Sequence, residues 1–315
     1  MSKSIVALSG GIGGAKLAKG LAQICDSDEL AIIANTGDDF QHFGLKVCPD
    51  IDTLIYTLAG VNNSETGWGR ESETWSFMAA MSDLGGDTWF NLGDKDLAQS
   101  VLRTTQLRNG KSLSEVSDYL AVQLGVSAQV IPMSDETVST TIETIDGALE
   151  FQQYFVRHQC KPVVKSIRFR GIEAAFPAPQ FLDLLNSNDV AAFVICPSNP
   201  YLSIDPILSL AGVRDGLRNN NAPVIAVSPI VNGDSLKGPT AKIMTELGVP
   251  CSATQIAKHY AGLIDGLVVD FSDSALSGEV ESMGVTVKTA HTMMNSRADR
   301  IALARVVLDF VQGIA

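Results

Sequence analysis

Short apolar runs alternate with amphipathic stretches at the start of the chain. Ile5–Leu8 is apolar enough for a buried strand, and the apolar spacing over Ala15–Ile24 predicts a helix. The continuously apolar run Leu30–Asn35 is typical of a strand covered on both faces. A strand, a helix and a second strand in this order predict a parallel sheet with right-handed crossovers.

The same alternation returns in the second half. Further strands are expected at Val190–Cys196, Pro223–Ser228, Leu267–Phe271 and Val285–Lys288. Helices are expected at Ile51–Ala59, Glu71–Leu84, Asp94–Arg108, Leu113–Leu124, Asp205–Asn219, Pro239–Leu247 and Arg297–Gln312. Asp94 and Ser112 are the candidate N-caps of two of these helices. The pattern predicts an α/β fold, a Rossmann-like and mostly parallel sheet with helices on both faces.

The pattern changes between residues 128 and 170. Strands are expected at Val130–Pro132, Thr137–Thr144 and Leu149–Arg157, and Asp146-Gly147 supplies a hairpin turn between the last two. We interpret 128–170 as a small β-rich insertion. Residues 1–127 and 171–315 then form one Rossmann-like core.

Composition excludes several classes of protein. The chain has 315 residues and a formal net charge of −12, which opposes general binding to nucleic acid. It has no run of eighteen apolar residues and no signal-peptide core after Met1, so we expect a cytoplasmic protein without a membrane span. The five scattered cysteines are expected to be reduced thiols.

A glycine-rich run directly after the first strand is the strongest candidate for chemistry. Gly10, Gly11, Gly13 and Gly14 precede Lys16, at the start of the first predicted helix. Glycine lets the backbone approach an anion closely, and a helix N-terminus attracts negative charge. The run therefore predicts a phosphate site, although it matches neither a P-loop nor a clean GxGxxG, and an ordinary tight turn is the alternative.

Two acidic pairs follow. Asp38 and Asp39 come after the second strand, and Asp50 and Asp52 lie at a predicted helix start. Four carboxylates in one region are unfavourable without a cation, and Mg²⁺ held by carboxylates and substrate phosphates would relieve the repulsion. The alternatives are a solvated turn for the first pair and a favourable helix dipole for the second.

Polar and aromatic residues near other helix starts complete the candidate set. Trp68 offers a ring for stacking, although tryptophans are also common in cores. The polar candidates are Arg70, Asn91, Asp94, Lys95, Ser198, Asn199 and Lys237. The four histidines show no metal-binding spacing and are expected to be structural.

Ten segments, in order and spread over nearly the whole chain, resemble the 2-phospho-L-lactate transferase family of coenzyme F-420 biosynthesis. They are SGGIGGAKL, NTGDDF, PDIDT, WGRESET, LGDKDLA, VIPMSDETVSTTIET, PSNPYLSIDPIL, VSPIVNG, KGP and SRAD. The resemblance implies a Rossmann-like fold with a smaller additional domain. It also implies transfer of a phospholactyl, phosphoenolpyruvyl or 3-phosphoglyceryl unit from a GDP-activated donor to the ribityl hydroxyl of the deazaflavin Fo, with release of GMP.

The resemblance also suggests roles for the candidate residues. Asp50 would be catalytic, and Asp38, Asp39, Asp50 and Asp52 would hold the required Mg²⁺. The nucleotide and its phosphates would bind Gly10, Gly11, Gly13, Gly14, Lys16, Ser198, Asn199 and Lys237. The deazaflavin would bind Asp52, Trp68, Arg70, Asn91, Asp94 and Lys95.

Two other classes of function remain open at this point. An NAD(P)-dependent oxidoreductase would use the glycine run, with Asp38 at the ribose, but the glycine spacing is atypical for it. A non-catalytic nucleotide sensor would bind nucleotide without turnover. A homodimer is the expected assembly, with 128–170 as a candidate contact surface.

Overall fold

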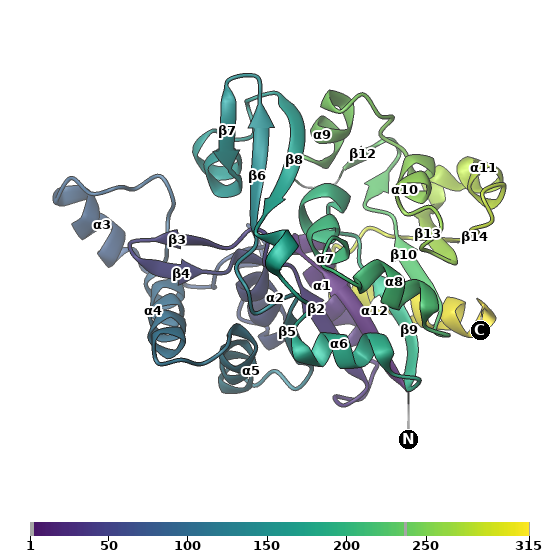
Figure 1. Cartoon of the computed structure of the whole chain (residues 1–315), viewed down its shortest axis with the longest axis horizontal. Coiled ribbons are helices and arrows are strands. Elements are labelled where there is room, and N and C mark those ends of the chain that lie inside the picture. The colour runs from purple at the N-terminus through teal and green to yellow at the C-terminus, as the bar shows by residue number, and fades with distance from the viewer. Residues whose placement is uncertain (1–2, 236–237, 315) are drawn as a thin grey trace.

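Seven parallel strands form the centre of the computed structural model, which describes residues 3–235 and 238–314 (Figure 1). In sheet order the strands are β14 (Thr286–Ala290), β13 (Gly266–Asp270), β10 (Val224–Val227), β9 (Val190–Ile195), β1 (Ser4–Ser9), β2 (Leu30–Ala34) and β5 (Gln129–Pro132). Every neighbouring pair is parallel. The predicted fold class is therefore confirmed.

The central strands bury both of their faces, because successive side chains point to opposite sides of the sheet and helices cover both sides. In β1, Ile5 and Ala7 join one hydrophobic cluster while Val6 and Leu8 join the other. The first cluster is covered by α1 (Gly11–Leu21), α2 (Pro49–Ala59), α5 (Leu113–Gln123) and α12 (Arg297–Ile314). The second is covered by α6 (Pro179–Asn186), α7 (Asp205–Leu208), α8 (Val213–Asn219), α10 (Ala253–His259) and α11 (Ser277–Glu281).

Two predicted helices are divided or shortened in the structure. The helix expected over Asp205–Asn219 is divided into α7 and α8, because Gly212 takes a left-handed conformation between them. The helix expected over Glu71–Leu84 is restricted to α3 (Ser76–Asp83).

A three-stranded antiparallel sheet stands beside the main sheet, where the insertion was predicted (Figure 1). Its order is β7 (Gly147–Glu150), β6 (Ser139–Thr144) and β8 (Val164–Arg170), and the predicted hairpin joins β6 to β7. A small hydrophobic cluster joins it to the body through Leu202 and Ile243.

Two details of the predicted insertion are wrong. The strand at 129–132 is β5, which pairs with β2 in the main sheet, so the excursion begins after it. The strand expected to reach Arg157 ends at Glu150, and a π-helix, η1, follows at Gln153–Arg157. The division into two domains stays a prediction.

The segment between α2 and α5 extends away from the main sheet (Figure 1). It contains α3 and α4 (Asp94–Arg108), and the hairpin of β3 (Phe40–His42) and β4 (Leu45–Val47) packs against α4. Ser112 caps α5 as predicted, accepting a hydrogen bond from the Glu115 amide. The remaining short elements are η2 (Ile172–Ala174), η3 (Pro200–Ile204), β11 (Ile230–Val231), β12 (Asp234–Ser235), α9 (Thr240–Glu246) and η4 (Phe271–Leu276).

The strand order reverses beside β1. From β1 the chain continues to β2 and β5 on one side, whereas β9, β10, β13 and β14 follow on the other. Ligands of open α/β sheets bind at such a switch point, outside the carboxyl ends of the strands. A ligand site is therefore expected at the loops after β1 and β9.

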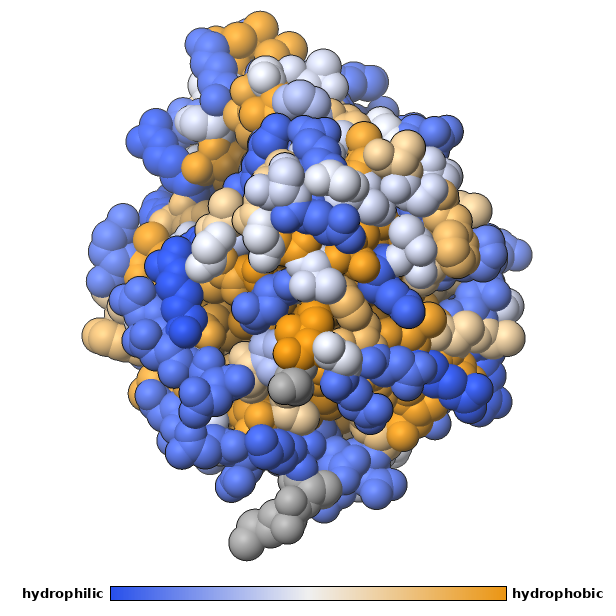
Figure 2. Space-filling view, turned by 90° about the vertical axis from the view of Figure 1, so that its right-hand side faces the viewer, coloured by the Kyte–Doolittle hydropathy of each residue, from blue (hydrophilic) through white to orange (hydrophobic). Residues whose placement is uncertain are grey.

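The surface shows both hydrophilic and apolar residues. On the face shown in Figure 2, hydrophilic residues cover most of the periphery and apolar residues are seen mainly in recesses between them. The edge strand β14 exposes Thr286 and Lys288, residues that discourage pairing with another sheet. Among the described residues, no helix is both long and apolar enough to cross a membrane. All five cysteines are free thiols, as predicted.

Close packing of α1 against α12 generates a first prediction. A Cβ added at Gly20 would lie 2.2 Å from the backbone carbonyl oxygen of Arg300, and only a shift of one helix would relieve this overlap. We expect Gly20→Ala to lower the free energy of unfolding by about 1–3 kcal/mol, measured by urea denaturation. Gly313→Ala is the matched control, since no atom lies within 4 Å of the added methyl group, and it should be neutral or slightly stabilising. Equal stability of the two variants would contradict this account.

Candidate active site

A cavity of about 680 Å³ opens at the switch point, within the size range of small-molecule sites. Its lining comes from the loops after β1, β2 and β9, from α2, from the aromatic segment before α4 and from the insertion. Eleven predicted site residues line it: Gly10, Gly11, Gly13, Lys16, Asp38, Asp50, Asp52, Trp68, Asn91, Ser198 and Asn199. The sequence therefore located this cavity, while the roles of these residues stay predictions.

The glycine run forms the first turn of α1 instead of a loop before it. The helix begins at Gly11, four residues earlier than predicted. A Cβ at Gly13 would lie 2.3 Å from the carbonyl oxygen of Pro197, and one at Gly14 would lie 2.4 Å from Ser198 Oγ. The glycines thus let the start of α1 pack directly against the loop after β9, and the Gly10 amide donates to Ser198 Oγ at 3.1 Å.

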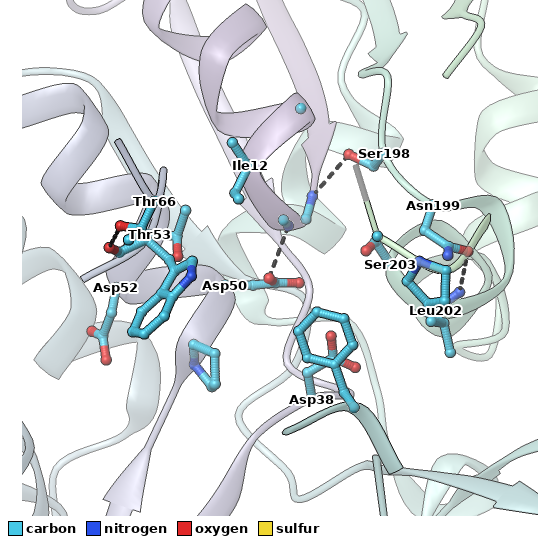
Figure 3. Close-up of a pocket in the computed structure, with 18 of the residues that line it drawn as sticks. Ile12, Asp38, Asp50, Asp52, Thr53, Thr66, Ser198, Asn199, Leu202 and Ser203 are labelled. Carbon is cyan, nitrogen blue, oxygen red and sulfur yellow. Dashed lines mark hydrogen bonds between the residues drawn. The ribbon is translucent and has the colours of Figure 1, made fainter. Parts of the chain in front are cut away.

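Asp50 lies at the centre of this arrangement (Figure 3). Its carboxylate accepts hydrogen bonds from the Gly11 amide at 2.8 Å and from Asn35 Nδ2 at 2.9 Å. Burial raises the pKa of Asp50 to about 6, although both hydrogen bonds oppose the rise. A carboxyl group that titrates this close to neutrality can accept a proton from a substrate hydroxyl.

Of the four predicted metal-binding carboxylates, two form ion pairs with basic side chains and two do not. Asp39 forms an ion pair with Lys46 at 3.0 Å. Asp52 forms an ion pair with the fully buried Arg103 and accepts a hydrogen bond from Gln99 Nε2 at 2.6 Å. Asp39 does not line the cavity, and its assignment to the metal stays a prediction that this position does not favour. Asp52 lines the cavity, but its oxygens are already engaged.

Asp38 and Asp50 are the remaining two. Across residues 3–235 and 238–314, no ion pair joins either of them to a basic side chain. Burial, followed by the negative charges of Asp50 and Asp39, raises the pKa of Asp38 well above its usual value. Asp38 Oδ1 is buried without a hydrogen-bond partner in the described part of the protein. In Figure 3 the Asp38 carboxylate points toward Asp50.

This pair fits the requirements of Mg²⁺. Mg²⁺ prefers one or two carboxylates and completes its octahedron with water and substrate phosphates. No group of three acidic, histidine or cysteine side chains able to hold a metal occurs among the described residues, so the protein alone offers no complete cage. The orphaned Asp38 oxygen and the uncompensated neighbouring carboxylate are the features that a divalent cation would satisfy.

Aromatic side chains form one wall of the cavity. Tyr56, Trp68, Trp89 and Phe90 line it, and the last two pack against Phe40 and His42 of the β3–β4 hairpin. Phe151 and Phe155, stacked at 5.3 Å, contribute from the insertion. Such a wall suits a flat heteroaromatic ring.

The opposite part of the cavity is lined by loops of the β9–β14 half. Asn199 caps η3 there, accepting hydrogen bonds from the amides of Tyr201 and Leu202 with its Oδ1. Its Nδ2 atom is buried and has no partner among the described residues. Ser228, Thr240 and Thr292 add further polar groups. This side offers donors and acceptors for a nucleotide.

Four other predicted residues do not line the cavity. Asp94 is not an N-cap of its own helix, because its carboxylate accepts from the Ser76 and Phe77 amides and so caps α3. The Glu73 carboxylate caps α4 instead, accepting hydrogen bonds from the Lys95 and Asp96 amides.

The other three are also held by structural contacts. Lys95 Nζ donates to the carbonyl oxygens of Glu71 and Ser72. The Arg70 guanidinium lies 5.5 Å from the centre of the Tyr56 ring. Gly14 faces Ser198 and Ser9. Their assignment to the ligand sites stays a prediction that these contacts do not favour, whereas Lys237 lies outside the described residues.

Several lining residues are not among the predicted site residues. Trp89 and Phe90 directly precede Asn91, so the aromatic segment itself was a signal. Asp96 also lines the cavity, where burial, followed by the charge of Asp52, raises its pKa to about 7. Phe151 and Gln152 follow a strand that was predicted to continue through them, and nothing in the local pattern pointed to a site.

Comparisons with known proteins agree with the geometry. The family model described as 2-phospho-L-lactate transferase CofD matches residues 5–306. A phosphoenolpyruvate transferase of Streptomyces griseus is 39% identical, with 98% of this chain and 99% of that protein covered. A 2-phospho-L-lactate transferase of Methanothermobacter thermautotrophicus is 38% identical, with 96% and 97% covered.

A solved structure shares the fold at low identity. A UPF0052 family protein from Bacillus halodurans superposes with a TM-score of 0.63 at 14% identity, covering 98% of this chain and 99% of that one. This likeness concerns the fold alone.

The buried carboxyl of Asp50 generates a second prediction. Its pKa of about 6 in the folded protein exceeds the value of about 3.9 in an unfolded chain, so the folded state binds the proton more tightly. Stability in metal-free buffer should therefore fall as pH rises from about 4 to about 6, by up to about 3 kcal/mol from this group. Asp50→Asn should flatten this part of the curve in urea unfolding across pH 4–8. Parallel curves for the two proteins would refute the assignment.

Proposed function

The chain belongs to the 2-phospho-L-lactate transferase family, and from this premise we propose that it transfers a phosphorylated three-carbon acid to the deazaflavin Fo. The donor is the GDP-activated acid, and GMP is the leaving product. The observation that carries the proposal is the position of Asp50: it lies between the first turn of α1, which can face a diphosphate, and an aromatic wall that can hold a flat ring.

The reaction is one displacement at phosphorus. The ribityl hydroxyl oxygen of Fo forms a bond to the phosphorus that carries the three-carbon acid. The bond from that phosphorus to the bridging oxygen breaks, and this oxygen leaves with GMP. The hydroxyl proton passes to a base, for which Asp50 is suited by its burial and its pKa of about 6. Alignment and charge neutralisation dominate such transfers.

The chain's own residues divide these tasks. The first turn of α1 presents backbone N–H groups and the positive end of the helix dipole, both favourable to phosphate. Asn35 and the Gly11 amide fix the orientation of the Asp50 carboxylate. Asp38 and Asp50 would hold Mg²⁺, which supplies charge neutralisation at the phosphate oxygens when bound.

The two substrates fit opposite parts of the cavity. Fo would place its ring system against Tyr56, Trp68, Trp89 and Phe90. The guanosine would lie toward Asn199, where the free Nδ2 donor can meet a carbonyl oxygen of the base. The carboxylates between them would then face the reacting hydroxyl and phosphorus. A cytoplasmic location and a homodimer stay predictions.

The family leaves the three-carbon acid to be determined. Relatives named for phosphoenolpyruvate and for 2-phospho-L-lactate are 39% and 38% identical to this chain, so overall similarity does not separate the two donors. We propose that the enzyme uses a donor of this class, and the product identifies which one.

Reconstitution tests the reaction directly. Purified enzyme, Fo, Mg²⁺ and the GDP-activated form of each acid should give a deazaflavin product whose mass equals Fo plus one phosphorylated acid unit, together with GMP. Mass spectrometry detects both the deazaflavin product and GMP, and the mass of the deazaflavin product identifies the acid. No product with any of the phospholactyl, phosphoenolpyruvyl and 3-phosphoglyceryl donors would overturn the proposal.

The role of Asp50 is tested in the same assay. Asp50→Ala should lower kcat by about 10²–10⁴-fold, because general-base and metal contacts are lost together, while the circular dichroism spectrum stays unchanged. Asp118→Ala, an exposed aspartate of α5 far along the chain from the site, is the control and should keep wild-type turnover. Wild-type activity of Asp50→Ala would remove Asp50 from the mechanism.

A further inference from the structure

The segment 36–39, which carries Asp38, has no regular secondary structure. The main body holds it at its two ends: Asn35 Oδ1 accepts from the Gly37 amide at 2.8 Å, and Lys46 pairs with Asp39. Inside the segment, the Asp39 amide donates to the Thr36 carbonyl oxygen at 3.2 Å and closes a turn. Neither the end contacts nor this turn bond engages the carbonyl oxygens of Gly37 and Asp38. The direction of the Asp38 side chain therefore depends also on contacts from other parts of the structure.

Those contacts come from the insertion. The Thr140 amide, in β6, donates to the carbonyl oxygen of Gly37 at 2.7 Å. Gln152 Nε2, just before η1, donates to the carbonyl oxygen of Asp38 at 3.3 Å. These two carbonyls precede and follow the Asp38 Cα atom, so the two bonds together fix the backbone from which its carboxylate projects.

The Thr140 side chain adds a third contact. A Cβ placed on Gly37 would lie 2.8 Å from Thr140 Oγ1, so this hydroxyl packs directly against the segment. Thr140 Oγ1 is buried and, like Asp38 Oδ1, completes no hydrogen bond of good geometry within the described residues. Both Thr140 and Gln152 are almost fully buried, and Gln152 also lines the cavity.

We propose that Thr140 and Gln152 are positioning residues, through which the insertion orients Asp38 toward Asp50. The inference rests on the proposed function for its consequence in catalysis, but the orientation itself is a property of the free protein. It also assigns a role to the segment VIPMSDETVSTTIET, which contains Thr140 and has no other part in the proposed reaction. Residues that orient metal-binding side chains commonly affect metal affinity or activity by 10- to 100-fold.

Hydrogen–deuterium exchange of the metal-free protein tests the orientation without any turnover. Gln152→Met keeps the size of the side chain but removes its donor. We expect the backbone amides of Gly37 and Asp39 to exchange about 3- to 10-fold faster in this variant. The reason is that losing the hydrogen bond from Gln152 to the Asp38 carbonyl oxygen loosens the segment. Gln153→Met, the neighbouring residue outside the cavity lining, is the control and should exchange as wild type.

Calorimetric titration of Mg²⁺ in the presence of GDP tests the consequence for the carboxylates. Gln152→Met should weaken Mg²⁺ affinity by about 10- to 100-fold, because it removes the donor to the Asp38 carbonyl oxygen. Thr140→Val keeps the backbone donor and alters only the packing hydroxyl, so it should weaken the affinity less, and Thr140→Ser should leave it unchanged. Thr141→Val is the matched control on the same strand, since successive residues point to opposite faces. In the transfer assay the two positioning variants should lower kcat more than they raise KM for Fo.

The outcomes separate the two proposals. If wild-type enzyme fails to modify Fo while Gln152→Met still exchanges faster and binds Mg²⁺ more weakly, the proposed function fails and the inference stands. If wild type is active and both positioning variants match their controls in exchange and titration, the inference is overturned. If Thr140→Val does not fold, Gln152→Met decides the question alone.

Discussion

Three segments of the chain meet at the Asp50 carboxylate. The Gly11 amide reaches it from the start of α1, Asn35 reaches it from the end of β2, and Asp50 itself lies in the first turn of α2. The approach is so close that a Cβ at Gly10 would lie 2.7 Å from Asp50 Oδ2. The glycine run is thus a packing requirement, besides being the proposed anion site. Hydrogen bonds favour the ionised carboxyl while burial opposes it, and the balance places its pKa near 6.

Two cations decide which acidic residues remain available to a ligand. The partly buried Lys46 neutralises Asp39, and the fully buried Arg103 neutralises Asp52 from inside the protein. Removing one partner of a buried pair such as Arg103–Asp52 typically costs about 3–5 kcal/mol, so the fold holds Asp52. Asp38 and Asp50 have no such partner among the described residues. Compensation of their charge is therefore left to whatever binds in the cavity.

The sequence predicted the sheet and the place of the site, because both depend on local signals. Apolar runs identify buried strands, and glycines after the first strand identify the switch point. It could not separate Asp38 from Asp39, because the two carboxylates are adjacent in a turn and only the ion pair of Asp39 with Lys46, which is formed in the folded protein, distinguishes them. Asp94 failed for a similar reason: an acidic residue at a helix start looks like an N-cap, but here it caps the neighbouring helix α3.

The insertion contributes cavity-lining residues that the sequence did not predict. Its aromatic pair, Phe151 and Phe155, lines the cavity only because the chain turns into a π-helix where a strand was expected. This wall has a chemical consequence under the proposed reaction, since water would attack the same phosphorus as the ribityl hydroxyl and waste the activated donor. Apolar rings over the reacting groups exclude water and strengthen the electrostatic contacts beneath them. Under the proposed reaction, the sheet switch point would supply the phosphate site, and the added layer would favour transfer over hydrolysis.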